Sequence, residues 1–376
     1  MTKEENEKFD AVFKDVGGRY YTDNKENDES FNIGLKQVID DAEGFIKYLR
    51  RSRYVNLPYI NFNIINNPTL NACAVLVGDE YYIGLNVGSF LLVNDMFSKM
   101  FSNKEIFSNI GNVSLETTSA KKLSRFIYND EIYFNTKVFE SFLPQDPIRG
   151  SFSMMLSWLA INYLVHHEIG HIIRGHCGYY KSISYKQHWS ELELKQFDNP
   201  FHFQTMEMDA DSFAVNYAFL STDNVAQAKA DGKTIDYPWN LIYTDIEIFF
   251  HYWTFAIYSF HRLCNIEHFN EEETNQLSHP PPSVRISLMM NNILSIMEKR
   301  NMPKIESMSN MLVKTIVEAE LAFSKITYEE NKPDIFFSNH VLSTNYTEKL
   351  MRNWNNVLPL IKPFAIAPES LPPPVT

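Results

Sequence analysis

The sequence predicts a mainly helical α+β fold in which a small antiparallel sheet packs on a long helix. Three short segments between residues 59 and 85 have the alternation or the turn boundaries of strands, whereas the apolar spacing after Gly88 is that of helices. The chain of 376 residues is 44% hydrophobic and 14% aromatic, so it can bury a large core. These features exclude a disordered chain and a glycine-rich repeat.

The amino-terminal part of the chain predicts one helix and three strands. The first 30 residues are acidic and have no sustained hydrophobic period, so we expect a loosely held arm or a cap. Apolar residues at positions 60, 62 and 64 alternate with Asn61 and Asn63, which is typical of a half-buried strand. A tight turn at Gly78-Asp79 predicts a hairpin. In order, we expect a helix at 32–51 and strands at 59–66, 71–77 and 80–85.

The rest of the chain is predicted to be helical, apart from an uncertain stretch near 126–134 and a loop at 177–200. Prolines at 280–282 begin one of the later helices, and the tail after Pro363 is expected to be extended. Long helices are expected at 150–176, 203–221, 238–265, 283–299 and 305–325. We expect an arm and helix at 1–55, a central domain at 56–300, and a helical extension with a proline-rich tail at 301–376.

Charge and cysteine content restrict the class of protein. The chain has 34 Lys and Arg against 46 Asp and Glu, a net charge of −12 that repels phosphate backbones, so we expect no nucleic-acid partner. The three cysteines, Cys73, Cys177 and Cys264, are widely spaced and predict neither a disulfide framework nor a cysteine-based zinc site.

Targeting features are also missing from the sequence. Residues 1–10 have neither the basic region nor the apolar region of a secretory signal. The most apolar stretches, 152–165 and 246–260, fall short of the ~18 uninterrupted apolar residues that a membrane-spanning helix needs. We therefore expect a cytoplasmic protein without stable membrane insertion.

The strongest chemical motif is His167-Glu168-Ile169-Gly170-His171, an H-E-x-x-H sequence within an apolar helical segment. Two histidines four residues apart share one face of a helix, so both can bind one Zn²⁺. Glu168 lies about 100° around the helix, where it can take a proton from a water that zinc activates. This chemistry is peptide-bond hydrolysis. Two exposed histidines around a solvated glutamate are the alternative.

A catalytic zinc needs a third protein ligand. A metzincin site is excluded because Arg174 and Cys177 stand where that pattern needs Gly and His. Glu207 and Asp211, again four residues apart on a predicted helix, are better candidates: one carboxylate can bind zinc while the other accepts the N–H of a ligating histidine. Asp209 lies elsewhere on this helix and is a weaker candidate. A solvated acidic face is the alternative.

In order and content, these motifs resemble the minigluzincin metallopeptidases, which include the HtpX heat-shock protease and the CaaX prenyl proteases and use H-E-x-x-H and E-x-x-x-D. Two further segments match in the right order. Asn71-Ala72-Cys73-Ala74 resembles the family's Asn-Ala-(Phe)-Ala strand, and Ser278-His279-Pro280-Pro281 with Arg285-Ile286 resembles its late motif. The four matches span about residues 60–300.

The resemblance implies that residues 56–300 form a zincin-like domain whose sheet packs on the zinc-binding helix. His167, His171 and Glu207 would bind one Zn²⁺ per chain, and Glu168 would be the general base. A soluble member is implied, because the spanning helices of the membrane-bound relatives are absent.

The resemblance also implies supporting and substrate-binding residues. Asp211 would orient a ligand, Arg285 would lie near the site, and His279 would stabilise the oxyanion; alternatively, His279 belongs to a turn and Arg285 to a surface ion pair. His176 would support the site or cap the end of the zinc helix. The expected substrate-binding strand, otherwise a core strand, comprises Ala72, Cys73, Ala74 and Val75.

A second resemblance, resting on the His-His-Glu-Ile-Gly-His core at 166–171 and on the Asn/Lys-rich composition, is to Lit-type phage-exclusion peptidases. The departures from the minigluzincin pattern are Cys73 in place of an aromatic residue and a long segment at 93–148.

The sequence therefore predicts a zinc-dependent endopeptidase acting on a peptide or protein substrate. The competing hypothesis is a catalytically silent or conditionally triggered zinc-binding protein that binds a peptide or protein partner in a regulatory or phage-defence role. The acidic arm and the long segments at 93–148 and 177–200, any of which could cover a cleft, favour this second hypothesis.

Overall fold

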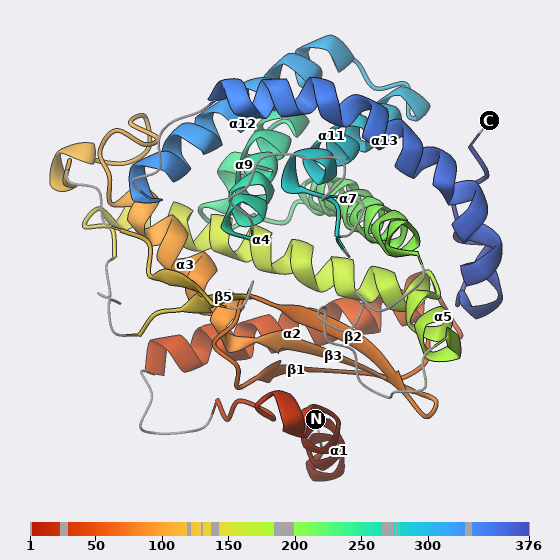
Figure 1. Cartoon of the computed structure of the whole chain (residues 1–376). Helices are drawn as coiled ribbons and strands as arrows, with labels where there is room; N and C mark the ends of the chain where they lie inside the picture. Colours follow the sequence, from red (N-terminus) through yellow and green to blue (C-terminus); the bar gives the residue numbers. More distant parts are fainter. Residues whose placement is uncertain are drawn as a thin grey trace.

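The structure is a computed structural model that describes residues 2–22, 29–118, 122–128, 131–136, 143–183, 199–264, 274, 277, 279–327 and 333–375. Figure 1 shows the long helix α4 through the middle of the molecule, with a three-stranded sheet on one side and most of the other helices on the opposite side. This arrangement confirms a mainly helical α+β fold with a sheet packed on the helix that carries the H-E-x-x-H motif.

The helices are α1 (Lys3–Phe13), α2 (Glu29–Ser52), α3 (Val87–Phe101), α4 (Pro147–Ile173), α5 (His176–Ile183), α7 (Pro200–Ala230), α8 (Trp239–Ile242), α9 (Ile246–Cys264), α11 (Pro282–Lys299), α12 (Ile305–Thr327) and α13 (Pro333–Ile361). The strands are β1 (Ile60–Ile65), β2 (Ala72–Val77), β3 (Glu80–Asn86), β4 (Arg125–Tyr128) and β5 (Glu131–Phe134). Short 3₁₀ turns are η1 (Lys14–Val16), η2 (Val113–Leu115), η3 (Lys362–Phe364) and η4 (Pro368–Ser370).

The three-stranded sheet is mixed, so the prediction of an antiparallel sheet is wrong for one strand pair. The strand order is β1-β3-β2. The turn at Gly78 makes β2 and β3 antiparallel, but β1 runs parallel to β3. The reason is that β2 takes the far edge of β3, so the connection at 66–71 crosses the end of β3 instead of joining neighbouring strands. As a result β2 is an edge strand, in contact with α4 and α5.

The amino-terminal segment packs on the sheet as a helix, so of the two expected forms it is a cap and not a loose arm. Phe9, Val12 and Phe13 of α1 are buried against the face of the sheet that points away from α4. The side-chain amide of Asn61 donates to the Glu5 carbonyl at 2.8 Å. Helix α1 therefore covers the polar face of β1, and this strand is buried on both sides instead of half-buried.

A buried arginine fixes the start of α4. Arg149 is fully buried, and each of its guanidinium N–H groups donates to a main-chain carbonyl at the end of α3 or in the segment that follows it, at 2.8–3.0 Å. The accepting carbonyls belong to Phe101, Asn103, Ile106, Phe107 and Ile110. An arginine has five such donors, so all of them are satisfied, and an irregular segment is held against the first turn of α4.

Two predicted helices are each divided into two. Helix α4 ends at Ile173 and α5 begins at His176, because Gly175 has a φ of +87° that an α-helix does not allow. The predicted helix at 238–265 consists of α8 and α9, separated by residues 243–245. Of the loop expected at 177–200, residues 177–183 belong to α5 and residues 184–198 lie outside the described part of the chain.

Two segments have more structure than their sequence indicates. The uncertain stretch near 126–134 forms the antiparallel pair β4–β5. The tail after Pro363 contains η3 and η4 and returns to the end of α4, where the Ile366 amide donates to the Ile173 carbonyl at 3.0 Å. None of the helices in the described ranges combines the length and the apolar character that crossing a bilayer requires.

Candidate metal centre

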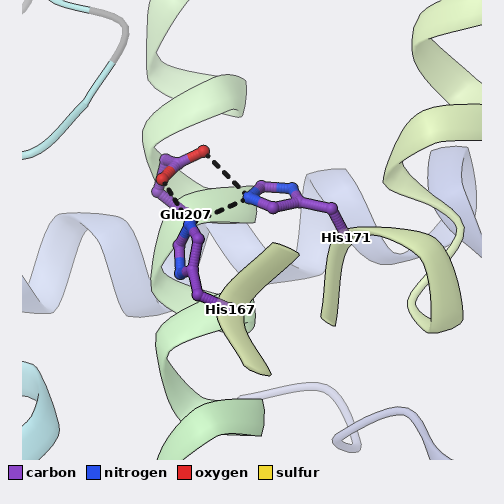
Figure 2. Close-up of side chains that lie close together, drawn as sticks. All are labelled: His167, His171 and Glu207. Carbon is purple, nitrogen blue, oxygen red and sulfur yellow. Dashed lines mark hydrogen bonds and ion pairs between the residues drawn. The ribbon is translucent and has the colours of Figure 1, made fainter. Parts of the chain in front are cut away.

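The H-E-x-x-H motif and the predicted third ligand meet in the structure. His167 and His171 lie one turn apart on α4, and Glu207 faces them from α7 (Figure 2). Nε2 of His167 is 3.1 Å from Glu207 Oε2, Nε2 of His171 is 3.2 Å from Glu207 Oε1, and the two Nε2 atoms are 3.0 Å apart. All three residues are at least 90% buried. Three potential metal-ligating groups therefore converge on one point.

A glycine allows the two helices to come this close. A Cβ atom on Gly170 would lie 3.2 Å from Phe213 Cβ and 3.3 Å from Ala210 Cα, both on α7. The fourth and fifth positions of the motif thus differ: Gly170 faces α7, while His171 presents its imidazole to the cluster beside it. The small residue brings Glu207 within reach of both imidazoles.

The donor set fits zinc. Two imidazole nitrogens and one carboxylate make a known catalytic zinc site, and with bonds of about 2.0–2.1 Å two ligands of a tetrahedral zinc are about 3.4 Å apart. The distances of 3.0–3.2 Å observed among His167, His171 and Glu207 are close to that value. In the part of the chain that the structure describes, this is the cluster of His, Cys, Asp and Glu side chains with metal-binding spacing.

The outer nitrogen of His167 is held by a buried network. Its Nδ1 lies 2.9 Å from Asp211 Oδ1. Arg285 binds the same carboxylate through Nε at 2.8 Å and Nη2 at 2.6 Å, and the Tyr163 hydroxyl donates to it as well. Burial raises the pKa of Tyr163 well above its ordinary value, so the hydroxyl stays protonated and remains a donor. The structure thus brings Asp211 and Arg285 to the site, as the sequence predicts.

The outer nitrogen of His171 is also occupied. Its Nδ1 lies 3.0 Å from Nδ1 of His176, the first residue of α5. His176 is fully buried, and its Nε2 lies 3.4 Å from Asp209 Oδ2 on α7. Arg174 Nε lies 3.5 Å from the same oxygen. His176 therefore supports the site instead of capping α4, which ends three residues earlier.

Electrostatics at the centre favour a cation. Burial opposes a charge on His167, but the carboxylates of Glu207 and Asp211 outweigh burial and raise the pKa of His167 to about 10. Burial also raises the pKa of Glu207, yet the nearby His279, His171 and His167 outweigh it and hold this pKa well below the ordinary value. The site thus keeps a carboxylate ionised in a buried position and attracts positive charge, which a divalent metal ion carries.

Two further predicted residues lie beside the ligands. Glu168 is 7% exposed, and burial raises its pKa above the ordinary value, with the neighbouring histidines acting in the opposite direction. The His279 side chain is 31% exposed, and its Nε2 lies 3.3 Å from Glu207 Oε2. His279 thus joins the buried ligands to the solvent-accessible side of the site. Ser278 of the same motif lies outside the described residues.

The predicted substrate-binding residues lie on the edge strand β2. The register pairs Ala72, Cys73, Ala74 and Val75 with β3, on the inner side of β2. On the outer side, the Cys177 thiol of α5 donates to the Ala74 carbonyl at 3.6 Å. Cys73 faces the α1 side of the sheet. Part of the β2 edge is therefore in contact with α5.

Sequence reasoning missed several members of these networks. Tyr163 lies four residues before His167, and this spacing on the same helix face would have indicated it. His261 is hydrogen-bonded to the Tyr163 hydroxyl at 3.0 Å, although no motif marks it. Asp209, expected only as a weak ligand, faces His176 instead of the metal position. His166 packs between Phe45 and Tyr217, away from the cluster of His167, His171 and Glu207.

The metal cluster lies within a region of the chain that matches a known protein family. No curated protein and no solved structure matches the chain. The matched range, which is less than half of the chain, contains α4, α7 and α11 and therefore every residue of the metal cluster. Residues 146–303 match the family model for Peptidase U49, and this match supports a peptidase family for the chain.

Proposed function

We propose that the protein is a zinc-dependent endopeptidase of the H-E-x-x-H…E type, with one Zn²⁺ per chain and a peptide or protein as substrate. The observation that carries this proposal is the convergence of His167 Nε2, His171 Nε2 and the Glu207 carboxylate, while the outer nitrogens of both histidines face Asp211 and His176. The family match adds independent support for peptide hydrolysis. The order of the four motifs along the chain, which resembles that in the minigluzincins, agrees with this proposal.

The ligands would be His167, His171 and Glu207. Zinc bound there supplies Lewis acidity, which makes water easier to deprotonate and polarises the carbonyl of the scissile bond. Asp211 and His176 would keep each imidazole in the tautomer whose Nε2 carries the lone pair. With zinc bound, the cluster would present two neutral nitrogens and one anionic oxygen.

Glu168 and His279 would act on the substrate. Glu168 would accept a proton from the attacking water and return it to the leaving amine; its raised pKa makes it a stronger base than an exposed glutamate. His279, at the accessible side of the site, would donate to the oxyanion that forms when the carbonyl is attacked. The edge strand β2 would pair with an extended substrate through main-chain hydrogen bonds.

The test compares three variants of the full chain. Glu168→Gln should retain one zinc by metal analysis and lose turnover, whereas His167→Ala and Glu207→Ala should lose both. Asp223→Asn is the control and should retain both zinc and turnover. Asp223 lies on α7, the helix of Glu207, and forms an exposed ion pair with Arg300. Full zinc occupancy in Glu207→Ala would remove the ligand assignment.

A survey of new protein amino termini would identify substrates. Cells expressing the wild type are compared with cells expressing Glu168→Gln, and cleavage products that occur only with the wild type establish the endopeptidase. Identical profiles, with zinc bound to both proteins, would instead favour a silent or triggered zinc-binding protein.

A further inference from the structure

The connection that begins at His171 Nδ1 extends well beyond the ligand itself. It runs from His171 through His176 and Asp209 to Arg174, at successive distances of 3.0, 3.4 and 3.5 Å, and we call these four side chains the relay. All four side chains are more than 90% buried. This chain of contacts is separate from the Asp211–Arg285 network on His167, so each histidine has its own support.

The backbone explains why these residues meet. Gly175, with φ of +87°, reverses the chain after α4, so that the first residue of α5 comes back under His171. Asp209 lies two residues after Glu207 on α7, and its side chain reaches the opposite side of His176. Helix α7 thus supplies both the predicted ligand Glu207 and Asp209, the carboxylate of the relay.

The Asp209 carboxylate determines which ring nitrogen of each histidine in the relay carries the proton. Asp209 is an acceptor, so His176 presents its Nε2–H toward that carboxylate and accepts at Nδ1. His171 must then donate through Nδ1–H, which leaves the lone pair on its Nε2, the atom that faces Glu207. The relay selects the tautomer of His171 that can bind a metal.

Asp209 is unusual as a structural residue. It is 2% exposed, and within the described residues no hydrogen bond of ordinary length reaches either of its side-chain oxygens. Its Oδ2 lies 3.4 Å from His176 Nε2 and 3.5 Å from Arg174 Nε. A buried carboxylate without hydrogen bonds weakens a fold unless a cation compensates it, and Arg174 is the cation beside Asp209.

Residues 365–370, after α13, contact Arg174, the last residue of the relay. Arg174 Nη1 donates to the Ser370 carbonyl at 2.5 Å, next to the bond from the Ile366 amide to Ile173. A Cβ on Gly175 would lie 2.5 Å from the Ala365 amide nitrogen, so the tail is in tight contact with the turn. Further along, the Val375 amide donates to the Asn355 side chain of α13 at 2.7 Å.

We propose that His176, Asp209 and Arg174 are positioning residues for His171, and that residues 365–370 hold Arg174 in place, so that a segment outside the matched family region helps to set metal affinity. The inference rests on the metal-binding part of the proposed function and not on peptide hydrolysis.

The test measures metal binding directly. Purified full-length protein is titrated with Co²⁺, whose ligand-field spectrum reports the geometry of its ligands, and Zn²⁺ affinity is obtained by competition with a chromophoric chelator. Asp209→Asn and His176→Leu should each bind Zn²⁺ about 10- to 100-fold more weakly, with an altered Co²⁺ spectrum. Asp223→Asn on the same helix should match the wild type.

A proline pair tests the tail. Ile366→Pro removes the amide that bonds Ile173, whereas Val375→Pro removes a tail bond to Asn355 of α13, which involves neither Arg174 nor α4. Ile366→Pro should weaken Zn²⁺ binding, by less than Asp209→Asn does, and Val375→Pro should not. Leu312→Ala creates a cavity at a fully buried position of α12, and it shows whether a loss of stability alone changes the Zn²⁺ affinity.

Three outcomes separate the hypotheses. If folded Asp209→Asn and His176→Leu bind Co²⁺ with wild-type affinity and spectrum, the relay has no positioning role. If these variants do not fold, equal affinities of Ile366→Pro and Val375→Pro overturn the proposal instead. If the wild type binds zinc but cleaves nothing, and Asp209→Asn and His176→Leu bind zinc more weakly, the relay is supported and the peptidase proposal is rejected.

Discussion

Arg285 binds Asp211 with two nitrogens, at 2.6 and 2.8 Å, across 74 residues of chain. The same carboxylate faces Nδ1 of His167. The pair therefore links α11 and α7 to His167 of α4 through a single buried carboxylate.

Removing Arg285 should destabilise the protein strongly. In Arg285→Met, Asp211 would remain buried without its two guanidinium hydrogen bonds, and we expect the free energy of unfolding to fall by about 3–5 kcal/mol, measured by urea denaturation of the metal-free protein. The matched variant is Arg300→Met, which breaks an exposed pair with Asp223 and should cost at most about 1 kcal/mol. Equal losses in the two variants would show that the buried pair has no special weight.

Activity should fall in acid because of Glu168. Burial raises the pKa of this carboxyl, and only the ionised form can accept a proton from water. The rate constant kcat/KM should therefore rise with pH, with a midpoint above the ordinary pKa of a glutamate, and be lost as pH falls through that midpoint. Bound zinc is measured at each pH, because a limb that follows zinc loss would belong to the ligands instead.

Two glycines of α4 should respond oppositely to alanine. Gly170→Ala places a methyl group against Phe213 and Ala210, so we expect the unfolding free energy to fall by about 1–3 kcal/mol and zinc affinity to fall as the helices separate. Gly150→Ala meets nothing within 4 Å and should gain about 0.5–1 kcal/mol. Unchanged zinc affinity in Gly170→Ala would mean that the helix spacing does not control the site.

His279 should affect turnover more than metal binding. If it donates to the oxyanion, His279→Ala should lower kcat by about 10²- to 10³-fold and retain zinc, with a smaller change in KM. His251→Ala, on α9 and bonded to Thr315, is the control and should leave kcat unchanged. Loss of zinc in His279→Ala would assign His279 to metal binding through its contact with Glu207.

Much of the site can be read from the sequence, because its members follow helix spacing. The pairs His167/His171 and Glu207/Asp211 are four residues apart, and that spacing alone puts each pair on one face. The order of the later motif also pointed to Arg285. The relay through His176 was harder to foresee, since it depends on Gly175 ending α4 and on Asp209 approaching from another helix.

The fold is predicted less completely, and the errors share a cause. Alternation at 60–64 identified β1 correctly but could not reveal that α1 covers its polar face, because burial of Asn61 depends on a helix 56 residues away. Local spacing likewise identified β2 and β3 as a hairpin. Whether β1 lies beside β2 or beside β3 is decided by tertiary packing, which leaves no local periodicity.

The carbonyl-binding arginine of α4 has a consequence for how this chain can vary. Arg149 recognises main-chain oxygens, which every amino acid carries, so the clamp itself places no demand on the identity of the side chains at 101–110. Substitutions that keep the backbone path can accumulate in this segment while the start of α4 stays fixed. The arginine, in contrast, has no substitute, because no other side chain offers five donors in one plane.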